Sequence, residues 1–421
     1  MEKPELFDTK KSFIWTVAVL SLFILIRLLF EYNTYREFIT KPFYFTQAKV
    51  LNHYQKSKYG KPYTVLKLQA DKGFTFYTTT HKTEDFSHSK IRIQIFPNKG
   101  ISFVEYLGTF YVKSRIKSVE RVPETFKDTF MTYVSAQHKN SSLANFYNAI
   151  FFATPIDKAL REKIALLGVS HLVALSGFHL GILWGLIYGL FLLFYRPLQQ
   201  KYFPYRHALL DVGLLTVILL GIYLWFVDFP PSLLRSYAMV LAGWAVILMG
   251  VELLSFKFLT AIALVLLALF PHLLVSLSFW LSVAGVFYIF LLLQYGKTYS
   301  KWIISLLLIP MGIFLLMLPI VHMIFPMTSD YQLLSPLLSI LFILFYPLVM
   351  LLHLFGLGNV LDTALLWLFS LPKESSGHLL PVWMGMLYIL LSLYAIRDKK
   401  AFYLLATVSV CYAVYIFRGA L

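Results

Sequence analysis

Apolar segments of 15 to 24 residues follow one another along most of the chain after residue 168, with short polar connections between them. They lie near residues 178–195, 208–227, 232–250, 257–271, 273–294, 302–325, 333–355, 379–396 and 401–417. A helix needs about 20 predominantly apolar residues to cross the hydrocarbon core of a bilayer. With a further apolar run at Ser12–Phe30, the segments predict a polytopic α-helical integral membrane protein of about nine or ten spans, some re-entrant or broken.

The composition agrees with this fold class. Of the 421 residues, 58% are hydrophobic and 14% are charged, which excludes a soluble globular protein. The formal net charge of +16 exceeds what cytoplasmic loops normally require under the positive-inside rule, so we expect an anionic partner. Cys411 is the only cysteine, which leaves no internal disulfide and no Cys-x-x-Cys motif. We expect neither a metal nor a cofactor.

The region from Glu37 to Val122 has a different character. It is polar and carries 15 Lys and Arg residues against 6 Asp and Glu residues. Short alternating runs separated by turn residues indicate β-strands. These runs are Phe43–His53, Tyr63–Leu68, Phe74–Thr79, Ile91–Phe96 and Phe103–Val119. Five strands of this length predict a small OB-like β-barrel domain outside the membrane.

Aromatic residues and lysines interleave in this basic region. OB-type barrels bind single-stranded nucleic acid by stacking bases on aromatic side chains beside a basic groove. The DNA-binding candidates are Lys56, Lys58, Tyr59, Lys61, Tyr63, Lys67, Phe74 and Phe76. The alternative is that half of the aromatic side chains pack the core of the domain and the lysines are only solvated.

Charge orients the chain in the membrane. Lys3, Lys10 and Lys11 precede the first span, so the positive-inside rule places the N-terminus in the cytoplasm and the basic domain in the periplasm. The positive-inside rule also places the basic connections later in the chain in the cytoplasm. With this number of apolar segments, that is possible only if one of them does not cross the membrane. Ser335–Leu354 fits best as that re-entrant or broken segment, because Pro347 interrupts it.

The predicted domains follow from these patterns. Residues 1–36 form a cytoplasmic tail and a membrane anchor, and residues 37–122 form the OB-like domain. Residues 123–167 form amphipathic linker helices, with a helix start at Thr154–Asp157. Residues 168–421 form the transmembrane core.

The segment Gly168–Gly181, GVSHLVALSGFHLG, places four polar or small residues inside an apolar run: His171, Ser176, Gly177 and His179. Ionisable groups at membrane depth mark pathways or sites, and irregular backbone there is tolerated only where protein shields it or water lines it. The Ser-Gly step therefore predicts a broken helix at a functional site. The alternative is a close helix contact at Ser176 and Gly177.

Two further constellations stand out in the apolar core. Arg235 enters a membrane segment directly after the turn Pro230–Pro231, where its guanidinium either faces a pore and meets phosphate, snorkels to the interface, or pairs with Asp228. Beyond Pro271, the spacing of Ser276, Ser278 and Ser282 does not fit one helix face, so we expect a break or an unwound turn there. The alternative is that these serines bond back to their own helix.

These motifs resemble those of the ComEC family of DNA-internalisation proteins. Gly168–Gly181 is similar to the family signature G-x-S-H-x-x-A-x-S-G-x-H, and Pro231–Arg235 is similar to the P-S-x-x-R-A step, with Ser236 in place of alanine. Phe279–Ser282 resembles the G-F-Q-L-S-F element, although Ser278 and Trp280 replace its glycine and glutamine.

Ser335–Leu337 resembles the start of the family's S-P-L-S-N element, from which Leu338 and Ser339 depart. The resemblance covers nearly the whole chain. Many family members carry a C-terminal metallo-β-lactamase-like domain. This chain ends at Leu421 and its eleven histidines form no H-x-H-x-D-H cluster, so we expect no nuclease activity and no enzyme.

The resemblance implies a channel that carries single-stranded transforming DNA across the bacterial cytoplasmic membrane. The expected partners are single-stranded DNA, the lipid bilayer, a periplasmic DNA-delivery protein and a cytoplasmic DNA motor. The expected pore or gating residues are His171, Ser176, Gly177, His179, Arg235, Ser278, Ser282 and Ser335.

Two other functions remain open at this point. One is a transporter of small anionic or lipid-linked solutes, for which the basic domain would be an unexplained accessory. The other is an intramembrane serine hydrolase with Ser176 as nucleophile and a histidine as base. No acid in Gly168–Gly181 orients such a base, which disfavours the hydrolase.

Overall fold

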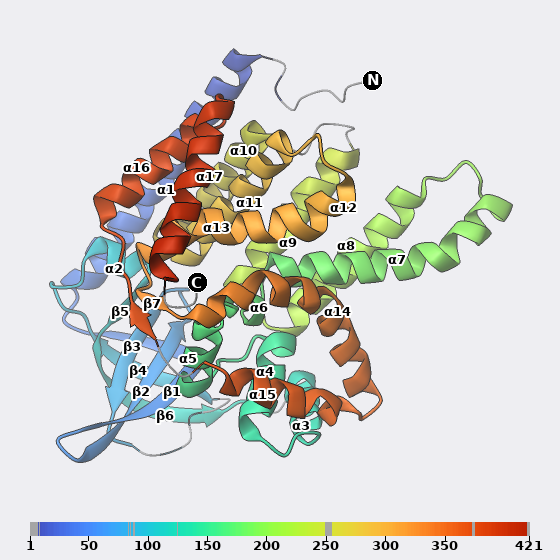
Figure 1. Ribbon diagram of the computed structural model, residues 1–421. Coiled ribbons are helices and arrows are strands. Elements are labelled where there is room, and N and C mark those ends of the chain that lie inside the picture. Colours follow the sequence, from blue (N-terminus) through green and yellow to red (C-terminus); the bar gives the residue numbers. More distant parts are fainter. Residues whose placement is uncertain are drawn as a thin grey trace. The chain divides into compact units, whose positions relative to one another are not determined.

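The computed structural model describes residues 7, 9–82, 84, 86, 89–123, 125–248, 255–372 and 375–418, and these are mostly helical (Figure 1). They divide into two compact units. The first comprises residues 7–129 and 260–280, and the second comprises residues 130–259 and 281–421.

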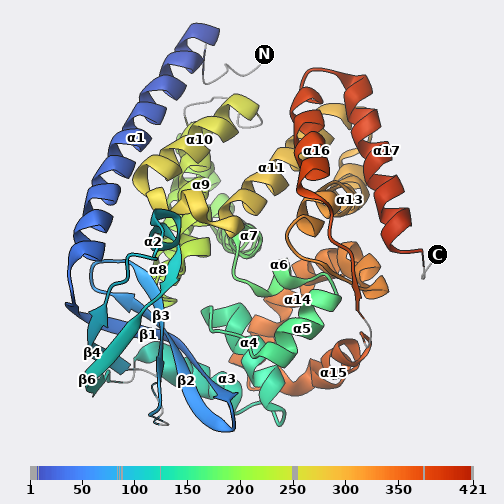
Figure 2. The same cartoon turned by 90° about the vertical axis from the view of Figure 1, so that its left-hand side faces the viewer.

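The first unit contains a long helix and a six-stranded sheet (Figure 2). Its elements are α1 (Lys10–Thr40), β1 (Tyr44–Lys58), β2 (Lys61–Ala70), β3 (Thr75–Thr80), β4 (Ser89–Phe96), α2 (Phe103–Leu107), β5 (Thr109–Tyr111), β6 (Lys113–Arg121), most of α10 (Phe256–Leu269) and the 3-10 turn η1 (Pro271–Val275). The strand order is β5-β3-β2-β1-β4-β6, and only the β3–β5 pair is parallel.

β5 and β6 are the two ends of the strand order, so the sheet is not a closed barrel and the predicted OB-like domain is not confirmed. The segment Phe103–Val119, which we expected to form one strand, is divided into α2, β5 and β6. Ser102 and Glu105 form a capping box, in which each side chain bonds the backbone N–H of the other residue. A helical turn therefore begins at Phe103, and only two separate strands follow it. The N–H and the hydroxyl of Ser102 both donate to the Glu105 carboxylate, which lowers its pKa.

A two-residue turn joins β1 to β2. Tyr59 and Gly60 have φ values of 51° and 74°, and they lie between the paired residues Lys58 and Lys61. Two successive positive φ values are typical of a type I′ turn, whose twist matches that of the strands. The predicted turn at this point is confirmed.

The C-terminal end of α1 is part of the core of the sheet. The Tyr35 hydroxyl donates a hydrogen bond to the carbonyl of Ile101 at 2.6 Å. The Phe38 ring lies 5.4 to 5.6 Å from the rings of Phe74, Tyr106 and Phe110. One continuous helix thus combines a long apolar stretch with an anchor for the sheet.

The described residues of the second unit form helices and connections, together with the short strands β7 (Met327–Thr328) and β8 (Ser376–Gly377). Its helices before residue 260 are α3 (Phe126–Ser135), α4 (Ser141–Phe152), α5 (Lys158–Leu166), α6 (Ser170–Val173), α7 (Gly177–Tyr202), α8 (Ala208–Phe226) and α9 (Pro231–Leu248). Those after residue 276 are α11 (Leu277–Tyr295), α12 (Lys301–Ile303), η2 (Ile304–Leu308), α13 (Ile309–His322), η3 (Asp330–Leu334), α14 (Ser335–Leu354), η4 (Gly358–Leu361), α15 (Asp362–Ser370), α16 (Val382–Tyr394) and α17 (Lys399–Ile416).

Seven helices in the described part of the chain are long and apolar enough to cross a membrane, fewer than the nine or ten spans that we expected. They are Lys10–Thr40, Gly177–Tyr202, Ala208–Phe226, Leu277–Tyr295, Lys301–His322, Asp330–Leu354 and Lys399–Ile416. Phe256–Leu269 and Val382–Tyr394 are apolar but shorter. This set suggests a multi-pass membrane protein.

Two local predictions have different outcomes. The linker is helical as predicted, and Asp157 is the N-cap of α5. The break expected at Pro347 is not observed, because α14 is helical from Ser335 to Leu354 with Pro347 inside it. A proline removes one backbone N–H, which bends a helix without ending it where the neighbouring groups compensate.

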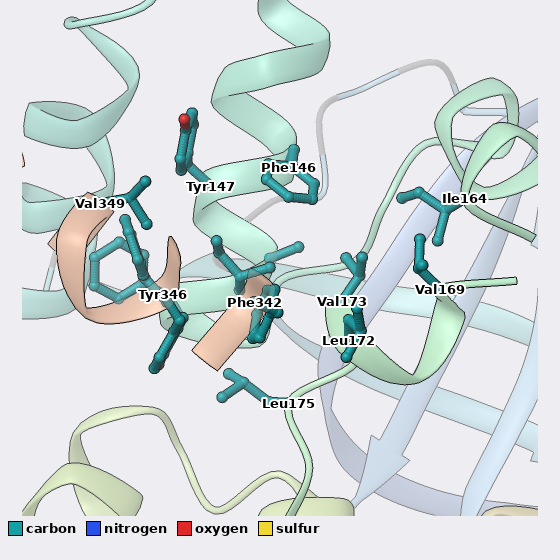
Figure 3. Packing of buried hydrophobic residues seen from close by; sticks show 14 of the residues in the cluster. Phe146, Tyr147, Ile164, Val169, Leu172, Val173, Leu175, Phe342, Tyr346 and Val349 are labelled. Carbon is teal, nitrogen blue, oxygen red and sulfur yellow. The ribbon is translucent and has the colours of Figure 1, made fainter. Parts of the chain in front are cut away.

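One apolar core surrounds the segment after α5 (Figure 3). It joins side chains from α4, α5, α6 and α14, among them Phe146, Ile164, Leu172, Phe342 and Tyr346. Leu172 and Leu175 are 3% exposed, so both ends of the stretch that precedes α7 are packed in place. This core positions the site described next.

Candidate functional site

The helix break predicted at the Ser-Gly step is present. α6 ends at Val173 and α7 begins at Gly177, and Ala174 and Ser176 between them have extended backbone. Ser176 is the N-cap of α7: its hydroxyl accepts a hydrogen bond from the N–H of Phe178 at 3.3 Å. In return, Nδ1 of His179 accepts the N–H of Ser176 at 3.3 Å. Histidine thus takes the place that Glu or Gln occupies in the usual capping box.

The start of α9 closes one side of this break. The Ser232 hydroxyl donates a hydrogen bond of 2.7 Å to the carbonyl of Leu175, which lies in the extended stretch. Gly177 faces Ser236, and a Cβ at Gly177 would lie 3.1 Å from its hydroxyl. The close helix contact that the sequence left as an alternative is therefore also present, at Gly177, together with the break.

The start of α14 closes the other side. The Ser335 hydroxyl donates a hydrogen bond of 2.9 Å to the carbonyl of Gly168. One turn later, Ser339 lies 3.1 Å from Nε2 of His171. Gly168 has a φ of +69°, and a Cβ there would lie 3.3 Å from the side chains of Gln332 and Ser335. Only glycine combines this backbone with this close approach.

We define the junction as the meeting of the 168–179 segment with the starts of α9 and α14. The structure brings six of the predicted pore or gating residues to it: His171, Ser176, Gly177, His179, Arg235 and Ser335. Sequence reasoning missed Ser339, which appeared only as a departure from the family pattern. The polar contacts of Ser232 and Ser339 satisfy backbone and histidine groups that the break leaves open.

Two residues at the junction are deeply buried. His179 is fully buried, and its ring lies 4.9 Å from the Tyr346 ring and 5.2 Å from the Phe342 ring, in edge-to-face geometry. Arg235 is 7% exposed and lies on α9 one turn after Ser232. Buried ionisable residues in an apolar helical bundle often belong to functional sites, so the junction is the candidate functional site.

Ser278 and Ser282 belong to α11 and not to the three segments that form the junction. Both are exposed on α11, and Ser278 falls in the first unit. The unwound turn predicted before them is confirmed: η1 is a 3-10 turn, and Ser276 has extended backbone before α11 begins. Their role in a pore stays a prediction.

The DNA-binding candidates divide between the two faces of the sheet. Directly paired residues share a face, and the register pairs Lys56 with Tyr63, Lys58 with Lys61, and Lys67 with Tyr77. Lys56 and Lys61 are exposed, and Lys67 lies over the Tyr77 ring at 5.8 Å.

Tyr59, at the tip of this hairpin, is 94% exposed. Phe76 is fully buried, and it pairs with Leu68 on the opposite face of the sheet. Phe74 packs against Phe38 in the aromatic core. These two phenylalanines build the core instead of offering surfaces for base stacking, which corrects their assignment. The alternation of residues in a strand does not show which face of the sheet is buried, because this depends on which face a helix covers.

Comparison with known proteins matches the helical part of the chain and not the sheet. A family model described as "Competence protein" matches residues 153–417, a range that contains α6, α7, α9 and α14 and excludes the six-stranded sheet. No curated protein and no solved structure matches the chain.

Proposed function

Because the chain belongs to the competence protein (ComEC/Rec2) family, we propose that it is a channel that carries single-stranded DNA across the cytoplasmic membrane during natural competence. Family membership suggests a role in competence and DNA uptake. The observation that supports this channel is the junction: a broken helix in an apolar bundle, bonded by hydroxyl groups from two other helices, one of which carries the buried Arg235.

The junction suits a polyanion. Backbone that departs from helical geometry supplies polar groups to a passing ligand, and a guanidinium binds phosphate oxygens in a bidentate manner. Both interactions are independent of base sequence. A channel for transforming DNA must pass every sequence, and weak repeated contacts let a polymer move where one tight site would hold it.

The basic hairpin of the sheet is proposed as the receiving surface on the periplasmic side. Lys10 and Lys11 are the first two residues of α1, and basic residues at this end of a span favour a cytoplasmic N-terminus and a periplasmic sheet. The exposed side chains of Lys56, Tyr59 and Lys61 combine positive charge with an aromatic ring, as single-strand binding requires. A periplasmic delivery protein and a cytoplasmic motor complete the proposed route.

The geometry of Ser176 and His179 speaks against the hydrolase. The serine hydroxyl lies 3.4 Å from Nδ1 of the histidine, but this nitrogen already accepts the N–H of Ser176. Its lone pair is therefore engaged in capping and is not available to remove a proton from the hydroxyl. We propose a transport role for these residues and not a catalytic one.

The proposal is tested by deleting the gene and following fluorescent double-stranded DNA into competent cells. We expect label to accumulate in the periplasm and not to reach the cytoplasm, since the step removed is passage of the inner membrane. Re-expression of the wild-type chain should restore entry. Unchanged entry in the deletion strain would contradict the channel and favour a transporter of small anionic or lipid-linked solutes.

The receiving surface makes a quantitative prediction. Changing Lys56, Lys61 and Lys67 together to glutamine should weaken binding of single-stranded DNA to the purified protein and flatten its salt dependence. Each lost phosphate contact lowers the slope of log K against log salt by about 0.7 for a single strand, so the slope should fall by about 2.

Fluorescence anisotropy with a labelled oligonucleotide over a salt series measures this slope. Arg397, in the connection between α16 and α17, and Lys399 and Lys400, at the start of α17, provide a control of equal charge change. Their replacement by glutamine should leave the slope as in the wild type. Equal slopes for all three proteins would remove the hairpin from the DNA path.

A further inference from the structure

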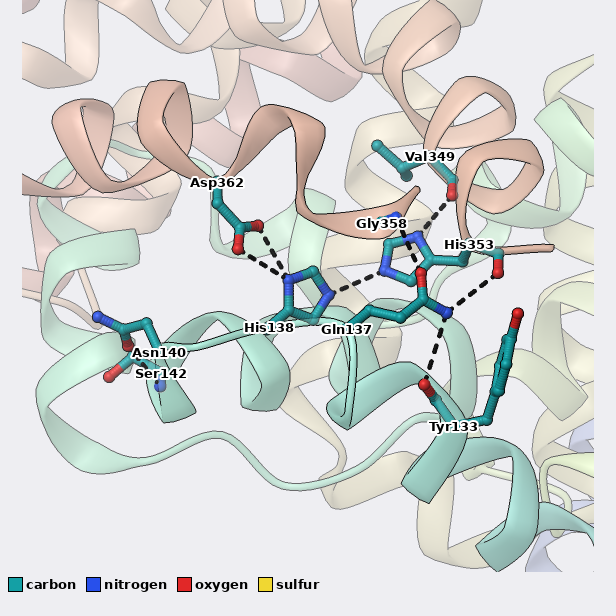
Figure 4. Close-up of polar contacts among 9 residues, drawn as sticks. All are labelled: Tyr133, Gln137, His138, Asn140, Ser142, Val349, His353, Gly358 and Asp362. Atoms are coloured by element: carbon teal, nitrogen blue, oxygen red, sulfur yellow. Dashed lines mark hydrogen bonds and ion pairs between the residues drawn. The ribbon is translucent and has the colours of Figure 1, made fainter. Parts of the chain in front are cut away.

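A cluster of ionisable side chains lies within the second unit, at the C-terminal end of α14 (Figure 4). Nδ1 of His138, in the α3–α4 connection, lies 2.9 and 3.1 Å from the two carboxylate oxygens of Asp362. Nε2 of the same ring lies 2.9 Å from Nε2 of His353. Nδ1 of His353 lies 2.6 Å from the carbonyl of Val349. The four groups form one chain of hydrogen bonds.

The partners at the two ends of the chain fix the number of protons in it. A carbonyl oxygen only accepts, so Nδ1 of His353 carries a proton and a neutral His353 has a bare Nε2. If Asp362 is ionised, Nδ1 of His138 also carries a proton, and a neutral His138 has a bare Nε2 as well. Two lone pairs would then face each other at 2.9 Å, which is repulsive.

One additional proton removes this conflict. It either makes one of the two imidazoles a cation beside the carboxylate or resides on Asp362, which then donates to His138 and leaves the proton of that ring on Nε2. In both cases the cluster holds one proton more than two neutral histidines and a carboxylate. A tetrahedral zinc ion at about 2.0–2.1 Å from both nitrogens would need them farther apart. Among the described residues, no group of three His, Cys, Asp or Glu side chains is arranged for a metal.

We propose that His138, His353 and Asp362 form a proton-binding site, in which one shared proton latches the α3–α4 connection to the C-terminal end of α14.

The surroundings support a latch. The His138 side chain is fully buried and that of Asp362 is 17% exposed, so the proton is shielded from bulk water. Gln137 accepts the N–H of Gly358 at 2.8 Å and donates to the carbonyl of His353 at 3.1 Å. Gln137, next to His138 in the chain, therefore also bonds the α3–α4 connection to the end of α14. Opening of the cluster would expose these backbone bonds.

Among the described residues, Tyr147 from α4 is a further titratable side chain that faces the cluster. Its ring stacks on that of His138 at 4.5 Å and lies 4.5 Å from that of His353. Burial raises the pKa of Tyr147, so its hydroxyl stays neutral over the accessible pH range. From α3, Tyr133 contributes only a backbone carbonyl, to Gln137. The charge of the latch is thus decided by the two histidines and Asp362.

The latch sits on the helix that also forms the junction. α14 carries Ser335 and Ser339 at its start and His353 at its end. Rings connect the two sites: Phe151 lies 5.1 Å from His353 and 6.1 Å from Tyr346, and Tyr346 lies 4.9 Å from His179. We therefore expect release of the proton to weaken the packing of α14 against the broken helix. This consequence rests on the proposed function, whereas the proton site does not.

Hydrogen–deuterium exchange of the purified full-length protein, in buffers from pH 5.5 to 9 and corrected for intrinsic exchange rates, tests the site without DNA. The bound proton stabilises the closed latch, so closure is complete at low pH and is lost as the pH rises. Opening releases one proton at pH values between the pKa of the open site and the higher pKa of the closed site. In this range, protection of a peptide covering Gly358 should fall up to tenfold for each pH unit.

Two variants and a matched control sharpen the test. In His353→Gln, the side-chain amide can donate to a bare Nε2 of His138, so protection should become independent of pH. In Asp362→Asn, the loss of the carboxylate should move the fall in protection to lower pH. His322→Gln is the control: His322 also ends an apolar helix and lies 2.9 Å from the carbonyl four residues earlier, but its Nε2 contacts the hydroxyl of Thr328 and no charged group. It should keep the wild-type pH dependence.

Protection at Gly358 that does not change with pH in the wild type would overturn the proposal. A pH dependence that persists unchanged in both His353→Gln and Asp362→Asn would do so as well. Neither result would bear on DNA uptake.

Discussion

Replacement of Gly168 by valine is expected to reduce transformation by at least about tenfold. A side chain with a φ of +69° costs about 1–2 kcal/mol, and overpacking against Gln332 and Ser335 costs about 1–3 kcal/mol more. The sum exceeds the 1.4 kcal/mol that corresponds to a tenfold change. The strain falls on the bond between Ser335 and the Gly168 carbonyl, which seats α14 at the junction.

Gly181 provides the matched control for this variant. It lies one turn into α7, and no atom lies within 4 Å of the position of a Cβ there. Gly181→Val should therefore transform like the wild type. Transformation frequency is measured relative to the amount of protein in the membrane fraction, which separates loss of function from loss of protein. A normal frequency for Gly168→Val would show that the junction does not need its close contact.

Replacement of Arg235 by alanine is the second large effect. The guanidinium is proposed to meet DNA phosphate beside the helix break, and the loss of a hydrogen bond to a charged group costs about 1.5–3 kcal/mol. Transformation should fall about 10-fold to 100-fold while the protein still reaches the membrane. Arg235→Lys keeps the charge but not the planar guanidinium. Its transformation frequency should therefore lie between those of the wild type and Arg235→Ala.

The control for Arg235 is Arg196, which is exposed near the end of α7. Arg196→Ala should have little effect, because it removes the same charge outside the junction. Were Arg235 only structural, Arg235→Ala would lower the amount of protein in the membrane in proportion to transformation. A normal transformation frequency in Arg235→Ala would end its proposed role.

Several features of the protein were determined by local sequence. Long apolar segments require membrane helices because lipid offers no hydrogen bonds to an exposed backbone. Ser176 and Gly177 begin α7 after the helix break, and the turn at Tyr59 and Gly60 joins two strands. Each of these signals acts within one helical turn or one hairpin, so the residues that carry it are neighbours in the chain.

Local sequence was weaker where two local signals competed. The alternation in Phe103–Val119 predicted a strand, but the capping pair Ser102 and Glu105 started a helix, and the sheet stayed open. Pro347 predicted a break that the surrounding helix tolerates. Such outcomes depend on which groups pack nearby, and the local pattern does not contain that information.

Only the tertiary structure decided the two sites. Gly168 and Ser335 are 167 residues apart, and His138 and His353 are 215 residues apart, yet each pair is in hydrogen-bond contact. No periodicity links residues at such separations, because their distance depends on how whole helices pack. The burial of Phe76 against the exposure of Tyr59 was decided in the same way, by which face of the sheet is covered. The sequence determined which residues are chemically unusual, and packing determined which of them meet.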